Sequence, residues 1–360
     1  MSTLDQTFAA ITAPNNRGRV LLFGVMMASV VGAFAYTGGW LSKGKLTPAR
    51  MIDAFEQVNG PHPGFRRNHA KGMGVSGYFE ASGQGARFSR AAVFKQGARA
   101  TVVGRFALAG GMPYAADTEQ NVRSLALSLI TPDGAEWRTG MNNIPVFVVN
   151  TPEDFYALTL AGAPDPKTGK PNPENAKAFV ASHPNTARAL KLLKAQPPAS
   201  GFDNSTYNSL NAFQLLDSAG HATPVRWAMV PETPFAPGAA PASAEHDFLF
   251  SALIRRLSQG PVRFRLILTI GQASDSTSDA TIPWPADREK VDAGTLLLEH
   301  AEPEATSSAR TINFDPLILP DGIVGSDDPL LSARSAAYSQ SFTRRVGEPV
   351  SPSAVTGAAQ

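Results

Sequence analysis

The stretch GPHPGFRRNHAKGMGVSGYFE, residues 60–80, is the part of the sequence from which the fold and the function can be predicted most directly. It places one histidine, His69, between the pair Arg66 and Arg67 and a run of glycines, directly before a strand-like segment. An imidazole can accept and donate a proton near neutrality, because its unperturbed pKa is about 6.5. The stretch therefore predicts a proton-transferring histidine at a strand entry, although a histidine that only stabilises a turn would give the same local pattern.

The composition of the 360-residue chain excludes several kinds of site. There is no cysteine, which excludes disulfides, zinc thiolates, iron–sulfur clusters and cysteine nucleophiles. The net charge of +2, from 32 basic and 30 acidic residues, argues against nucleic acid as a partner, which needs a strongly basic face. The six histidines have no H-E-x-x-H spacing and no G-x-S-x-G motif is present, so zinc-enzyme and hydrolase hypotheses lack a starting point.

The N-terminal region carries an uncharged, mostly apolar run over residues 20–42. A membrane-spanning helix needs roughly 20 apolar residues, and the AFA tripeptide at residues 33–35 resembles a signal-peptide cleavage site. We expect residues 1–19 to be a tail and residues 20–42 to be a transmembrane anchor or a cleaved signal segment. Basic residues on both sides leave the orientation ambiguous; we favour a cytoplasmic N-terminus, with the rest of the chain exported to the periplasm.

Strand and helix patterns follow each other along the rest of the chain. Apolar or alternating runs bounded by Gly, Pro, Asn and Asp are typical of an all-β barrel or sandwich rather than βαβ units. They predict strands over residues 77–81, 98–108, 124–131, 144–149, 212–216, 225–230 and 262–270. Capping residues, prolines and amphipathic spacing predict helices over residues 43–56, from Thr151, over 186–195 and over 328–342. We expect one folded domain, residues 43–350, followed by a flexible tail, residues 351–360.

Four groups of segments, in the right order along the chain, together resemble the heme catalases. One such segment would be weak support, but four in sequence are specific. In chain order they are RRNHAKG at 66–72 with GYFE at 77–80; Arg105-Phe106 with ADT at 116–118 and Arg123; NNIPVF at 142–147 with Phe155; and NFDP at 313–316 with LPDGI at 319–323, RSAAY at 334–338 and Arg345.

The resemblance implies an α+β fold in a single domain: a catalase-like antiparallel eight-stranded β-barrel with helical excursions. It also implies heme b (iron protoporphyrin IX) as cofactor. The chain departs from the large catalases at Asn68, at Phe342, and at Ala107, where they usually carry a small hydroxyl residue. With these departures and its N-terminal segment, the chain resembles the short catalase-related peroxidases. The implied reaction is reduction of organic hydroperoxides and hydrogen peroxide by a small-molecule electron donor, through a ferryl intermediate.

Two residues are the expected catalytic groups. By the resemblance, His69 takes a proton from the peroxide and returns it to the far oxygen. Asn142 donates a hydrogen bond to the peroxide without adding charge. The sequence alone would equally suit a turn asparagine, since Asn142-Asn143 precedes Ile-Pro.

Six residues are expected to bind the cofactor. Tyr338 is implied as the axial ligand of the heme iron, and Arg334, four residues earlier on the same helix face, would stabilise its phenolate. Arginine binds carboxylates bidentately and suits the heme propionates. The proposed set is Tyr338, Arg334, the propionate partners Arg66, Arg105 and Arg345, and Phe155, whose ring would stack on the porphyrin. Ordinary core packing and surface charge are the alternatives for each residue taken singly.

Three other functions stay open at this stage. The same residues would serve a catalase that dismutates hydrogen peroxide. The fold also hosts lyases and isomerases of fatty hydroperoxides. A non-catalytic heme-binding protein would show the same cofactor residues. The sequence leaves the oligomeric state and the electron donor open.

Overall fold

The structure, a computed structural model, describes residues 14–37, 45–238 and 245–355. It divides into two compact units, Met1–Arg50 and Met51–Gln360. The first contains the helix α2 (Pro14–Thr37), which begins within the expected tail and covers the expected anchor or signal segment as far as its end. Residues 1–13 and 38–42 of these two predictions lie outside the described residues. Across the parts of the chain that the structure describes, no helix combines the length and apolar character that a bilayer crossing requires.

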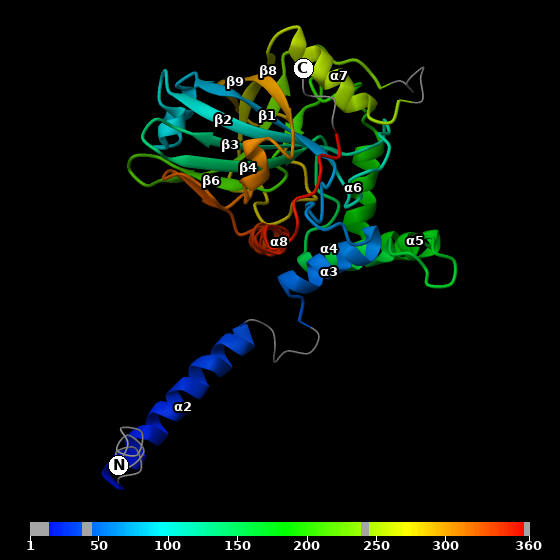
Figure 1. Cartoon of the computed structure of the whole chain (residues 1–360). Coiled ribbons are helices and arrows are strands. Elements are labelled where there is room, and N and C mark those ends of the chain that lie inside the picture. The colour runs from blue at the N-terminus through cyan, green and yellow to red at the C-terminus, as the bar shows by residue number, and fades with distance from the viewer. Residues whose placement is uncertain (1–13, 38–44, 239–244, 356–360) are drawn as a thin grey trace. The chain divides into compact units, whose positions relative to one another are not determined.

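Antiparallel strands close into a barrel in the second unit (Figure 1). Around the ring the order is β1–β2–β3–β4–β5–β7–β8–β9, and β9 pairs with β1. The expected eight-stranded antiparallel barrel is therefore confirmed. Two short strands extend the sheet: β6 pairs with β7 on the same edge as β5, and β10 pairs with β6. The bounds are β1 (Gly72–Ala81), β2 (Arg99–Leu108), β3 (Arg123–Ile130), β4 (Glu136–Asn142), β5 (Tyr207–Asn208), β6 (Phe213–Leu216), β7 (Ala222–Pro231), β8 (Val262–Ile270), β9 (Lys290–Pro303) and β10 (Ile323–Gly325).

The alternation of side chains decides which face of each strand fills the barrel. In β3 the leucines at 125, 127 and 129 are buried in the core, so the residues between them face outward. In β2, Phe106 packs inside, 5.2 Å from the Phe202 ring centroid and 5.7 Å from that of Tyr207. The interior is thus filled by side chains, and the outer face of β2, β3 and β4 is left for a site.

Helices leave the barrel between strands and cover parts of its outside (Figure 1). Two of the expected caps are confirmed: Thr151 accepts from the Asp154 amide at 3.0 Å and Asp328 from the Leu330 amide at 2.9 Å. The bounds are α3 (Pro48–Asn59), α4 (Pro152–Ala161), α5 (Pro173–Ser182), α6 (Pro184–Lys194), α7 (Phe248–Ser258) and α8 (Pro329–Val346), with the short 3₁₀ turns η1 (Gln84–Arg87), η2 (Ala92–Phe94) and η3 (Ser308–Thr311).

The strand expected over residues 144–149 is wrong. β4 ends at Asn142, and the backbone beyond it bonds elsewhere. The Phe147 amide donates to the Ala280 carbonyl at 2.9 Å, and the Ile144 carbonyl accepts from the Asn208 side chain at 2.9 Å. An apolar run alone therefore did not make a strand here, because its backbone bonds to a loop at Ala280 and to a side chain of β5 and not to the backbone of a neighbouring strand.

The folded part continues past residue 350, where a flexible tail was expected to begin. The Ala305 amide donates to Ser353 at 2.8 Å, and Val355 is buried in the core. Residues 351–355 therefore belong to the packed structure. Residues 356–360 of the expected tail lie outside the described residues.

Two basic residues of the opening stretch that received no catalytic role are buried in ion pairs. Lys71 donates to Asp117 and to Asp247, each at 2.6 Å. Arg67 pairs with Glu56 at 2.7 Å and also with Glu348. A buried charge needs such partners, since unpaired burial is costly. The ADT tripeptide at 116–118 therefore supplies the partner of Lys71.

Candidate active site

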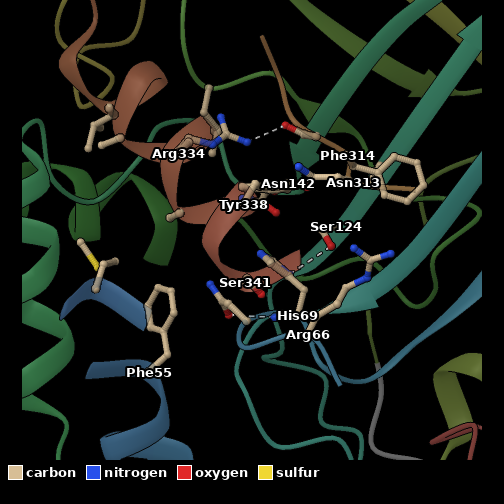
Figure 2. A pocket seen from close by; sticks show the side chains of 18 of the residues that line it. Phe55, Arg66, His69, Ser124, Asn142, Asn313, Phe314, Arg334, Tyr338 and Ser341 are labelled. Carbon is tan, nitrogen blue, oxygen red and sulfur yellow. Dashed lines mark hydrogen bonds between the residues drawn. The ribbon is translucent and has the colours of Figure 1, made fainter. Parts of the chain in front are cut away.

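A cavity of about 1300 Å³, part of it open to solvent, has walls from the outer face of the barrel and from α3, α4 and α8. All eight residues selected from the sequence line it: Arg66, His69, Arg105, Asn142, Phe155, Arg334, Tyr338 and Arg345. Figure 2 labels side chains around the space, among them Tyr338 and Arg334 on α8 and His69 on the loop before β1. The sequence prediction that these residues share one site is consistent with this arrangement.

The floor of the cavity is a patch of small residues on neighbouring strands. Ser124 on β3 pairs with Ala107 on β2 and with Asn142 on β4. Two positions along β3, Ala126 pairs with Gly140. Directly paired residues have Cβ atoms roughly 5 Å apart, so Ser124 and Asn142 are immediate neighbours. The small side chains leave a flat surface on which a planar group can lie.

The backbone of His69 adopts a strained conformation that its neighbours support. Its φ of 54° lies in the left-handed region, which costs a non-glycine residue about 1–3 kcal/mol. Asn68 Oδ1 accepts from the His69 amide at 2.9 Å and from the Gly110 amide at 3.0 Å. Arg105 donates to the carbonyls of His69 at 2.8 Å and Ala70 at 3.2 Å. Asn68, one of the departures from the large catalases, thus holds the turn that presents the histidine.

The imidazole of His69 is anchored at one nitrogen and directed into the cavity. Ser124 Oγ lies 3.1 Å from Nδ1 (Figure 2). Burial, and then the cations of Arg105 and Arg334, lower the pKa of His69 to about 3. The ring is therefore neutral at pH 7 and has a lone pair that can accept a proton.

The two asparagines at the end of β4 have different roles. Asn143 Oδ1 accepts from the Arg123 amide at 2.7 Å, which fixes the strand end. Asn142 faces the cavity, and its side chain makes no hydrogen bond to any described residue. Of the two asparagines, Asn142 is thus the one whose side-chain amide can bind a ligand, which is the residue that the resemblance to the catalases implied.

The start of α8 is held by a polar network that ends at Arg334. The capping carboxylate of Asp328 also accepts from the Asn211 side chain at 2.7 Å. Asn211 Oδ1 accepts in turn from Arg334, whose second terminal nitrogen donates to the Gly140 carbonyl at 3.1 Å. The guanidinium is therefore fixed against the floor of the cavity.

Tyr338 lies one helical turn beyond Arg334, on the same face of α8. A Cβ added to Gly140 would come within 3.3 Å of the Tyr338 oxygen and 3.4 Å of Arg334 Nη2. Phenol oxygen and guanidinium are thus close to the same small residue. A phenol oxygen held in this way is a suitable ligand for ferric iron.

One carboxylate, Glu304, joins two arginines at the edge of the cavity. It pairs with Arg66 at 3.2 Å and with Arg105 at 2.6 Å. Burial alone would raise the pKa of Glu304, but the charges of Arg105 and Arg66 outweigh it and lower the pKa to about 2. Arg105 donates hydrogen bonds to Glu304 and to the backbone carbonyls of the His69 loop, so it holds the histidine in place.

The third arginine, Arg345, is buried, and no described carboxylate forms a direct ion pair with it. It is 6% exposed and packs against the Phe342 ring at 5.3 Å. Its guanidinium makes no hydrogen bond or ion pair with another described residue. Burial and the nearby Arg66 lower the pKa of Arg345. Among the described residues, Glu304 is the carboxylate that pairs with Arg66 and Arg105, so these three arginines and one glutamate carry an excess of two positive charges and suit a dianionic group.

Comparison with known proteins identifies the family. The family model described as Catalase matches residues 46–352. The chain belongs to the catalase family. It is 39% identical over 329 residues to the catalase-related peroxidase of Synechococcus elongatus, covering 89% of this chain and 95% of that protein. It is 32% identical over 308 residues to the catalase-related peroxidase of Mycolicibacterium paratuberculosis, covering 84% and 96% respectively.

Solved catalase structures share the fold. A fungal catalase superposes with a TM-score of 0.72 at 20% identity, covering 82% of this chain and 62% of that one. Catalase A from Saccharomyces cerevisiae gives 0.71 at 20% identity, with coverage of 82% and 64%. The chain thus spans less than two thirds of the length of these catalases. The likeness establishes the barrel and its helical excursions.

Catalases are heme proteins, and the residues around this cavity fit a heme. The flat floor suits a planar macrocycle, and Tyr338 offers an oxygen ligand for its iron. The rings of Phe55 and Phe147 lie 5.9 and 5.4 Å from that of Phe155, and all three line the cavity as an apolar wall. The unpaired Arg345, in a region with two excess positive charges, suits two propionates.

Several residues of the site were not anticipated: Ser124, Gly140, Glu304, Asn211, Phe55 and Phe147. Ser124 could have been found, because alternation along the expected strand at residues 124–131 puts it opposite to the core leucines. Glu304 and Asn211 gave no local signal, since their partners Arg105 and Arg334 are 199 and 123 residues away.

Proposed function

We propose that this chain is a heme b-dependent peroxidase that reduces organic hydroperoxides and hydrogen peroxide with an external small-molecule electron donor. The observation that carries the proposal is the single cavity shared by a neutral His69, the unbonded amide of Asn142 and the phenol of Tyr338. The catalase-related peroxidases among the relatives support the same activity. Heme bound at Tyr338 would supply the redox chemistry that side chains lack.

The acid–base work falls to His69. Its free ring nitrogen accepts the proton from the peroxide oxygen that is bound nearest the cofactor. Asn142 donates a hydrogen bond to the peroxide and orients it without adding charge. When the O–O bond breaks, the departing oxygen would take the proton back from His69, while the two electrons and the acceptor of the other oxygen atom are chemistry that bound heme would supply. The departing oxygen leaves as an alcohol, or as water when the substrate is hydrogen peroxide.

The remaining residues hold and shield the cofactor. Arg334 lies beside the phenol oxygen of Tyr338, and Arg66 and Arg345 would bind the propionates. Arg105 has a different part, which is to brace the backbone of His69. Phe155 and its neighbouring rings exclude water from the macrocycle.

A catalase that dismutates hydrogen peroxide is the second candidate. It is favoured by relatives such as mouse catalase, which is 26% identical over 295 residues, with 56% of that protein covered. The two functions separate in one assay. Dioxygen released from hydrogen peroxide alone, faster than an added donor is oxidised, would favour the catalase.

The optical spectrum of the purified protein tests the proposal. We expect a high-spin ferric Soret band in the wild type that is lost or shifted in Tyr338→Phe. His69→Gln should keep the band and lose reaction with peroxide. Colourless protein after growth with ample iron and hemin would overturn the proposal, and so would full peroxide turnover by His69→Gln.

We also propose that the chain is exported and works in the periplasm, with residues 20–42 as inner-membrane anchor or cleaved signal. The support is the uncharged run with arginines before it and lysines after it. Large apolar side chains of α2, such as Leu21, Phe23 and Phe34, are also exposed. Intact-mass measurement of protein from separated cell fractions tests this. A full-length chain confined to the cytoplasmic fraction would contradict it.

A further inference from the structure

A second, smaller cavity of about 270 Å³ adjoins the candidate active site. It shares Arg66 and Arg345 with the large cavity. Its other walls come from residues that the large cavity does not use, among them Glu304, Arg310 and residues 351–354. Two residues of its lining, Ala305 and Pro352, are exposed, so the small cavity can be reached from solvent.

The walls of the small cavity are held in place by hydrogen bonds. The Ala305 amide donates to Ser353 at 2.8 Å, and the Gly64 amide donates to the Glu348 carboxylate at 2.7 Å. The buried side chain of Val355 fixes the end of the same segment. A small molecule can therefore bind here with little ordering of the protein, which favours affinity.

Arg345 can bind an anion in each of the two cavities. It is 6% exposed, and its guanidinium makes no hydrogen bond or ion pair with another described residue. A guanidinium has five N–H donors in a rigid fork, and a carboxylate that binds bidentately uses two of them. Because Arg345 lines both cavities, it has donors for a propionate in the large cavity and for a second carboxylate in the small one.

Arg310 adds a positive charge that the propionates do not require. The other three arginines and Glu304 carry an excess of two positive charges, which matches the two propionates. Arg310 lies in the last turn of η3, near enough to Arg345 for the two cations to repel each other. Its side chain makes no hydrogen bond or ion pair within the described parts of the chain. With the cofactor bound, one positive charge remains at the small cavity, which suits a monoanion.

We propose that the small cavity binds the electron donor, a small monoanionic phenol that carries a carboxylate, through Arg310 and Arg345. The inference rests on the proposed function, in which an external donor reduces the cofactor. The carboxylate would lie between the two guanidinium groups, and the Phe65 ring in the wall offers an apolar contact to the phenol ring.

This position separates the donor from the peroxide. His69 and Asn142 do not line the small cavity, so the donor and the peroxide do not compete for one space. For each hydroperoxide that is reduced, two donor molecules each give up one electron and their phenolic proton. The products are one alcohol, one water and two phenoxyl radicals.

The first test measures binding to the heme-loaded resting protein, without turnover. Calorimetric titrations compare phenylacetate with the neutral phenylacetamide, which has the same ring. We expect phenylacetate to bind more tightly and Arg310→Met to weaken it about tenfold, as the loss of a charge-assisted hydrogen bond predicts. Arg255→Met, at an exposed site on α7, is the matched control and should keep the wild-type Kd. Equal binding of the two compounds, or an unchanged Kd in Arg310→Met, would overturn the proposal.

The second test compares 4-hydroxyphenylacetate with 4-hydroxyphenylacetamide as donors at saturating peroxide. We expect the wild type to have a higher kcat/KM for the acid, mainly through a lower KM. Arg310→Met should reduce this preference about tenfold, whereas Arg310→Lys, which keeps the charge, should retain most of it. The Soret band of each variant checks that it is folded and loaded with heme.

The outcomes separate this inference from the proposed function. If the heme-loaded protein oxidises neither donor, the proposed function fails, and the phenylacetate titration still decides whether the anion site exists. If both donors are oxidised but the preference for the acid is absent in the wild type, or survives in Arg310→Met, only the donor site fails.

Discussion

The phenol oxygen of Tyr338 lies against Gly140, where a Cβ would be 3.3 Å away. The carbonyl of the same glycine accepts from Arg334 at 3.1 Å. The absence of a side chain at Gly140 and this hydrogen bond together fix the positions of Tyr338, the proposed iron ligand, and of Arg334 beside it. The position of the ligand is thus set by the strand opposite α8 as well as by the helix.

Gly140→Ala should change the heme spectrum more than the fold. An alanine Cβ would push Tyr338 and Arg334 by a few tenths of an ångström, which would move the phenol oxygen that is proposed to bind the iron. A strand glycine replaced by alanine changes stability by about 1 kcal/mol or less, so heme-free protein should unfold as the wild type does. Optical spectra and urea unfolding measure the two effects. An unchanged spectrum in both Gly140→Ala and Gly140→Val would contradict the contact.

Glu304→Gln should destabilise the heme-free protein at neutral pH. The pKa of Glu304 falls from 4.5 to about 2, which corresponds to about 3 kcal/mol of stability. Because the folded pKa is the lower one, this stability is present above pH 4.5 and is lost as the pH falls towards 2. Urea unfolding at pH 7 and at pH 3 should therefore show a smaller deficit for the variant at the lower pH. Glu289→Gln, at an exposed pair with Arg87, is the control expected to have no effect.

His69 should not titrate in the usual histidine range. Its pKa is lowered to about 3, so the ring stays neutral as the pH falls from 8 to 5. The rate constant for peroxide should be flat over that range in stopped-flow measurements. The same shift makes the fold less stable below about pH 6.5, because His69 binds a proton in the unfolded chain but stays unprotonated in the folded chain. An acid limb of the rate near pH 6.5 that disappears in His69→Gln would contradict this.

Arg345→Met should affect the heme-free and heme-bound protein in opposite ways. The guanidinium is buried and forms no direct ion pair with a described residue, so its removal should leave the unfolding free energy equal or higher. A charge-assisted bond contributes about 1.5–3 kcal/mol, so heme should bind about 10- to 100-fold more weakly. Heme titration and urea unfolding give both numbers. Arg255→Met, at an exposed site on α7, should change neither, and unchanged heme affinity in Arg345→Met would remove Arg345 from the propionate site.

The elements with strong local patterns were predictable from the sequence. The caps at Thr151 and Asp328 depend on neighbouring residues, and the strands over 98–108 and 124–131 follow from their apolar spacing. β4, with the sequence EWRTGMN, has no such pattern and was missed. β9 was missed as well, because it is defined by pairing with β1 more than 200 residues away.

The site was predictable where a family motif marks it. His69, Asn142, Arg334 and Tyr338 reach one cavity as the resemblance implied. Glu304 and Asn211 were not predictable, because they act on arginines from distant parts of the chain. The role of Arg105 differed in detail: in the structure it supports the His69 loop, which only the three-dimensional hydrogen bonds reveal.

The barrel is joined at one place by a very short seam. β5 has two residues, and it meets β4 through the single pair Asn142 and Asn208. A barrel opens most easily between the strands that share the fewest hydrogen bonds. Amide hydrogen exchange should therefore be fast at the β4–β5 pairing and slow in β2 and β3. Asn142, whose side chain is proposed to bind peroxide, therefore belongs to the pairing where we expect the barrel to open most easily, and a more stable β4–β5 pairing should make the peroxide site more rigid.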